Sequence, residues 1–226
     1  MVEKFVSSLS VKAQNIVKKY MEQYEDLTFE VLYTDETKMI SGNGTYIICL
    51  DKKNTLDIEY RFMHEFFHCI QDKEGFPSLI PINNEYRDLA AELSSIILDL
   101  NIYKRLEEYQ YYQTTKYAKE MVRKNIQVLE IINKYHDKKE FNSQEDFINL
   151  AGTIITSDIL KVDNSKMVNL IKQTRYKAIN YYKIFKDILD KYDYNVPNDV
   201  FLVFKILIEE FDLSSYVKVI GDRNIT

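Results

Sequence analysis

Proline and glycine are scarce in this chain, which has three prolines and five glycines among 226 residues. That scarcity excludes collagen-like and low-complexity proteins, and a hydrophobic content of 46% excludes a disordered chain. The two cysteines, Cys49 and Cys69, are too few for a disulfide-stapled domain, and their apolar neighbours are typical of buried thiols. The length is enough for one large domain or two small ones, with a core that needs no metal to fold.

Positive charge is in deficit: the chain has 30 lysines and arginines but 35 aspartates and glutamates. Its formal net charge is therefore -5. The chain therefore lacks an overall positive field to hold nucleic acid or an anionic membrane. Charged residues interrupt the apolar runs, and the first ten residues lack the layout of a signal peptide. We expect a cytoplasmic protein without a membrane partner, and the charge argues against nucleic acid as a partner.

Apolar spacing predicts an α+β fold that is predominantly α-helical. A small antiparallel β element is expected over residues 27–50, with its stronger strand at 44–50. Residues 73–81 hold two of the three prolines and are expected to form a loop. Residues 1–136 are expected to form one domain and 137–226 a helical C-terminal region, which can belong to the same domain. The expected helices span 3–24, 55–72, 84–108, 113–136, 144–160, 165–192 and 198–212, with a further strand at 217–220.

One motif in the chain carries chemistry. The chain has three histidines, and two of them stand in the run His64-Glu65-Phe-Phe-His68, an H-E-x-x-H sequence inside the helix expected over 55–72. Two histidines four residues apart project from the same helix face and can bind one Zn²⁺. Glu65 lies ~100° further around the helix, where it can act as a general base. The third histidine, His136, is expected at a helix C-terminus, where the helix dipole favours a polar or cationic side chain.

Residues 44–100 resemble the zincin metallopeptidases, and within them the gluzincin-like proteins of the ImmA/IrrE type. The resemblance is carried by the strand at 44–50, the His64 to His68 motif and a following helix with acidic residues. It implies a cytoplasmic zinc peptidase, a hydrolase of peptide bonds. No Gly-x-x-His continuation follows His68, so the third-histidine pattern of the metzincins is absent.

A catalytic zinc needs a third protein ligand and an open position. Four acids at spacings of three, four and seven are expected to share one face of the helix at 84–108: Glu85, Asp88, Glu92 and Asp99. Glu92 is the favoured ligand, because its setting resembles the third-ligand helix of the ImmA/IrrE type. Glu85 and Asp99 remain alternatives, and acids that do not bind metal can instead hydrogen-bond a ligand histidine.

The sequence therefore predicts a zinc-dependent metallopeptidase with Zn²⁺ bound by His64, His68 and Glu92, and with Glu65 as the general base. A peptide or protein substrate is expected to add as a strand to the edge of residues 44–50. The alternative is a catalytically inactive, zincin-fold protein that binds a partner or regulates it. Retention of Glu65 argues against that alternative, since a structural zinc site needs no general base.

Overall fold

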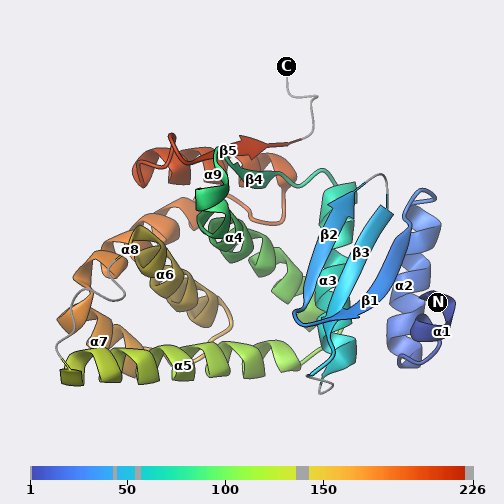
Figure 1. Cartoon of the computed structure of the whole chain (residues 1–226), viewed down its shortest axis with the longest axis horizontal. Coiled ribbons are helices and arrows are strands. Elements are labelled where there is room, and N and C mark those ends of the chain that lie inside the picture. The colour runs from blue at the N-terminus through green and yellow to red at the C-terminus, as the bar shows by residue number, and fades with distance from the viewer. Residues whose placement is uncertain (1, 43–44, 54–56, 136–142, 222–226) are drawn as a thin grey trace. The chain divides into compact units, whose positions relative to one another are not determined.

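The computed structural model describes residues 2–42, 45–53, 57–135 and 143–221, and it confirms the predominantly α-helical α+β class (Figure 1). The chain divides into two compact units. Unit 1 is Met1–Gly75 with Glu108–Gln113, and unit 2 is Phe76–Glu107 with Thr114–Thr226. The expected boundary at 136/137 lies outside the described residues. Among the residues that are described, no helix combines the length and the apolar character needed to cross a membrane.

The expected single helix at 3–24 is two helices, α1 Val2–Val6 and α2 Val11–Gln23. The break occurs because Ser10 caps α2: its hydroxyl accepts a hydrogen bond from the backbone N–H of Ala13 at 3.2 Å. The same serine donates to Glu59, by its backbone N–H at 2.6 Å and by its hydroxyl at 2.8 Å. This network fixes where α2 begins.

The sheet of unit 1 has three strands in the order β1-β3-β2, namely β1 Phe29–Thr34, β3 Thr45–Asp51 and β2 Lys38–Gly42. Strand β2 is antiparallel to β3, as expected for this region, but β1 is parallel to β3. The wholly antiparallel prediction was therefore wrong. It failed because β2 was missed, and this added strand returns the chain so that β1 and β3 run the same way. Strand β3 consequently lies at the centre of the sheet.

Helix α3, Ile58–Lys73, covers one face of this sheet by contacting β2 and β3 (Figure 1). Aromatic side chains on one side of α3 make this contact. Phe62 and Phe66 stack with ring centroids 5.9 Å apart, and both rings contact Phe29 of β1. The return segment of unit 1 joins the same core. There, the hydroxyl of Tyr111 donates to Glu59 at 3.0 Å.

Unit 2 is mostly helical. The expected strand at 217–220 is confirmed, and it pairs antiparallel with a strand at 78–81 that was expected to be loop. The expected helix at 165–192 is interrupted at Arg175. The elements from residue 78 onward are β4 Ser78–Pro81, the 3₁₀ turn η1 Asn84–Tyr86, α4 Arg87–Glu108, α5 Gln113–Tyr135, α6 Gln144–Ile159, α7 Ser165–Thr174, α8 Tyr176–Leu189, α9 Pro197–Glu210 and β5 Val217–Ile220.

Candidate metal centre

Helix α3 presents the two motif histidines from one side. At ~100° per residue, positions two apart differ by ~200°, so His64 projects away from the Phe62 and Phe66 side that holds the sheet. Between residues 60 and 71 every position is buried except His64 and His68. Their ring centroids lie 5.1 Å apart. The helix therefore keeps its aromatic side in the core and leaves a narrow stripe of partial exposure at the two imidazoles.

The His68 ring has a hydrogen-bond partner on its own helix. Its Nδ1 lies 3.2 Å from Oε1 of Gln71, which is three residues further on and only 2% exposed. An amide oxygen can only accept, so this bond favours the tautomer with a proton on Nδ1. The Nε2 lone pair is then the atom available to a metal, which is how ligand histidines are usually oriented. Sequence reasoning missed Gln71, although its spacing from His68 was a readable signal.

Glu65 is buried, with an exposed fraction of 8%. A carboxylate at such a position is costly to bury unless it interacts with a charge, a hydrogen-bond donor or a metal. Cys69 lies one turn further along α3, and its Sγ donates to the Glu65 carbonyl oxygen at 3.4 Å. Burial is the main cause that raises the pKa of the Cys69 thiol well above its ordinary value, and the negative charge of Glu65 adds to the increase. Cys69 and Cys49 are both free and buried.

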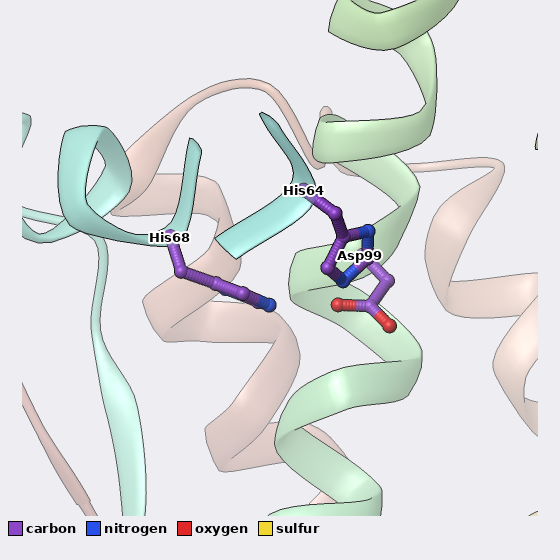
Figure 2. A group of neighbouring side chains, drawn as sticks. All are labelled: His64, His68 and Asp99. Atoms are coloured by element: carbon purple, nitrogen blue, oxygen red, sulfur yellow. The ribbon is translucent and has the colours of Figure 1, made fainter. Parts of the chain in front are cut away.

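Asp99 is the acid that groups with the two histidines. One ligand atom from each of His64, His68 and Asp99 lies within 4.8 Å of the others (Figure 2). Two imidazoles and a carboxylate are a donor set that catalytic zinc accepts. The hydroxyl of Tyr103 donates a long hydrogen bond of 3.5 Å to Asp99.

Glu92, the favoured third ligand from the sequence, is not in this group. Its Oε1 accepts a hydrogen bond of 2.6 Å from the side-chain amide of Asn149 on α6. Burial raises the pKa of the Glu92 carboxyl, and the Asn149 hydrogen bond opposes that shift. Gly152 lets α6 lie close to α4, because a Cβ there would come within 2.5 Å of the Ile96 side chain. Glu92 is thus engaged in holding the two helices together.

Two other expectations about the site also need correcting. Glu85 lies in the 3₁₀ turn η1 before α4, so the four acids do not share one face of a single helix. Strand β3, the expected substrate strand at 44–50, has neighbours on both sides and presents no edge. His136 lies outside the described residues.

Comparisons with protein-family models, with curated proteins and with solved structures found no match to this chain. The resemblance to zincins is therefore carried by the residues of the motif and their setting alone.

Proposed function

We propose that this protein is a zinc-dependent metallopeptidase, with His64, His68 and Asp99 as the metal ligands. The observation that carries the proposal is the H-E-x-x-H sequence on one buried helix, whose two histidines are its only partly exposed positions between residues 60 and 71. The closeness of the Asp99 carboxylate to both imidazoles supports the ligand set. Asp99 takes the place that the sequence favoured for Glu92.

Each residue then has a distinct task. The hydrogen bond between Gln71 and Nδ1 of His68 leaves Nε2 as the nitrogen that would bind a metal ion. A bound zinc would supply a Lewis acid that polarises the scissile carbonyl and makes water more acidic. Glu65 removes a proton from the attacking water and delivers it to the leaving amine. Burial of Glu65 suits this task, because a water-poor site strengthens the electrostatic interactions that organise the transition state.

We place an extended peptide at the edge of β2, which is one of the two edge strands of the sheet of unit 1. Strand β2 ends the strand order on one side and contacts α3, the helix that carries the motif. Main-chain hydrogen bonds along Lys38–Gly42 would bind the peptide backbone independently of its sequence. Side chains along the strand would then select among substrates.

The proposal is tested by cleavage of a peptide library prepared from an unrelated proteome. The full chain is assayed after loading with zinc, after removal of metal, and after zinc is added back. We expect new peptide N-termini, detected by mass spectrometry, in the first and third samples but not in the second, because the hydrolysis needs the metal. Stoichiometric zinc without any cleavage would contradict the peptidase proposal and favour the inactive, partner-binding alternative.

The third ligand is tested by comparing two carboxylates of α4. They stand seven residues apart, about 10.5 Å along the helix, so they cannot both bind an ion held by the same two histidines. We expect Asp99→Ala to weaken zinc affinity by more than ~100-fold, beyond the ~10 to 100-fold cost of losing an outer hydrogen-bond partner. Glu92→Ala is the matched variant, and competition with a zinc-binding dye is the measurement.

In the Glu92→Ala protein we expect zinc affinity close to that of the unmodified chain, together with a lower thermal midpoint, because Asn149 loses its partner. The reverse order of zinc affinities would return the ligand role to Glu92.

A further inference from the structure

The sheet of unit 1 has a second face, the one that points away from α3 (Figure 1). Side chains alternate across a strand, so the positions between the buried ones point to this outer face. It holds an open hollow of about 610 Å³. The residues that line the hollow all belong to unit 1 and are Leu32, Thr34, Asp35, Glu36, Lys38, Ile40, Ile47 and Cys49.

The middle of the outer face is apolar. Leu32 and Ile40 are 41% and 42% exposed, and Ile47 lies half-buried on the strand between theirs. A sheet face that stays in water ordinarily carries polar side chains. A continuous exposed apolar patch with a polar rim is instead typical of an interaction site. The outer face is therefore a candidate docking surface.

The pairing register arranges six outward positions of this face in two neighbouring rows across β1, β3 and β2. The first row is Leu32, Cys49 and Lys38, and the second is Glu30, Ile47 and Ile40. The exposed Glu30 thus stands at one corner of the patch and Lys38 at the opposite corner. Leu32 and Ile40 stand at the other two corners. The patch therefore has an anion and a cation at opposite ends of one diagonal and apolar side chains at the ends of the other.

This pattern is complementary to itself. Consider a two-fold axis between two copies that follows the diagonal from Leu32 to Ile40. It places Lys38 of each copy near Glu30 of the other, because a two-fold interface repeats each contact in reverse. Leu32 and Ile40 then each meet their own equivalent. The strands of the two sheets cross at a large angle, as they do in orthogonal sheet packing. A partner of a single charge sign would instead meet a like charge at one corner.

The remaining charges at the rim do not oppose such a contact. Lys38 forms an ion pair with Glu36, and Lys52 forms one with Asp35 at 3.1 Å. The ammonium group of Lys38 has three N–H donors, so it can bind a second carboxylate while it keeps Glu36. The rim of each copy is therefore largely neutralised within its own chain.

We propose that two copies of this chain associate through the outer face as a weak two-fold dimer. Three strands at a spacing of about 4.8 Å and short strand lengths give a face of only a few hundred Å². Stable interfaces bury about 800 Å² per partner, so we expect a Kd of about 10 to 100 µM. The proposal does not depend on zinc or on peptide hydrolysis.

The test is sedimentation velocity of the full chain at concentrations from about 1 to 300 µM. We expect the mean mass to rise from that of one chain towards that of two. Glu30→Lys and Lys38→Glu are each expected to weaken the dimer by at least ~10-fold, because each reversal creates two contacts between like charges. The double reversal exchanges the two corners and should restore the Kd to within ~3-fold of the unmodified chain.

Ile40→Thr tests the apolar part of the contact. Threonine keeps the β-branched side chain that suits a strand, while the apolar contact at the axis is lost, so we expect the dimer to weaken by at least ~10-fold. Glu22→Lys is the matched control for the charge reversals. This exposed residue belongs to α2, which packs against α3, and its variant should dimerise as the unmodified chain does.

Circular dichroism of every variant checks that it is folded. A chain that keeps the mass of one copy at about 300 µM overturns the proposal and leaves the outer face to a different partner. A dimer that both single reversals leave unchanged would place the interface elsewhere on the molecule. A folded double variant that fails to dimerise overturns the two-fold arrangement of Glu30 and Lys38.

Discussion

Zinc is expected to be lost from the protein when His64 or His68 is replaced with alanine. Each variant keeps two of the three proposed protein ligands, and two ligands hold zinc poorly. Metal analysis after gel filtration should give about one zinc per unmodified chain and less than ~0.1 per variant chain at micromolar protein. The variants should keep their helical circular dichroism, because a chain of this length buries enough apolar surface without metal.

His136→Ala is the matched control for these two variants, since it removes the remaining histidine of the chain without touching the motif. We expect it to retain zinc in full. Full retention in both His64→Ala and His68→Ala would rule out the metal centre. Loss in all three variants would show that the histidines are not specific to one site.

Glu65→Gln should separate catalysis from metal binding. The amide keeps the size of the carboxylate but cannot accept the proton, so we expect peptide hydrolysis to fall by about 10² to 10⁴-fold in kcat. Zinc content should stay at the level of the unmodified chain, because Glu65 is not among the three grouped ligands. The measurement is the initial rate on a peptide found in the library assay, with zinc quantified in the same sample.

Glu74→Gln, at the C-terminal end of the same helix, controls for the loss of one negative charge and should keep nearly full activity. If Glu65→Gln hydrolysed peptide at the unmodified rate, Glu65 would have no part in the mechanism. If it lost zinc as well as activity, its role would be that of a ligand.

The sequence predicted the helix of the motif well, because both of its signals are local. The spacing of His64 and His68 and the apolar positions around them depend only on the 3.6-residue repeat of one helix. The same holds for the aromatic side at Phe62 and Phe66, whose contact with the sheet follows from the apolar pattern. Local periodicity thus placed the helix and the histidine pair.

The third ligand could not be chosen in this way. Glu92 and Asp99 lie two helical turns apart on nearly the same side of α4, so helix phase alone does not distinguish them. A tertiary contact separates the two acids in the structure: Asn149, which is 57 residues further along the chain, donates a hydrogen bond to Glu92. Strand β2 was missed for a related reason, since Lys38–Gly42 has a weak alternating pattern and becomes a strand through its pairing with β3.

Unit 1 is discontinuous, and this limits how the chain can be divided by gene fusion or truncation. A fragment ending at Gly75 would lack Tyr111, which is 2% exposed and bonded to Glu59, and Tyr109, whose ring stacks on Phe67 at 5.9 Å. The unit that carries the histidine motif therefore cannot be transplanted as one contiguous piece of gene with its packing intact. A recombinant gene that keeps the packing around the motif must also keep Glu108–Gln113, which is encoded after most of α4. Because that stretch of gene includes part of unit 2, the two units are expected to be inherited together.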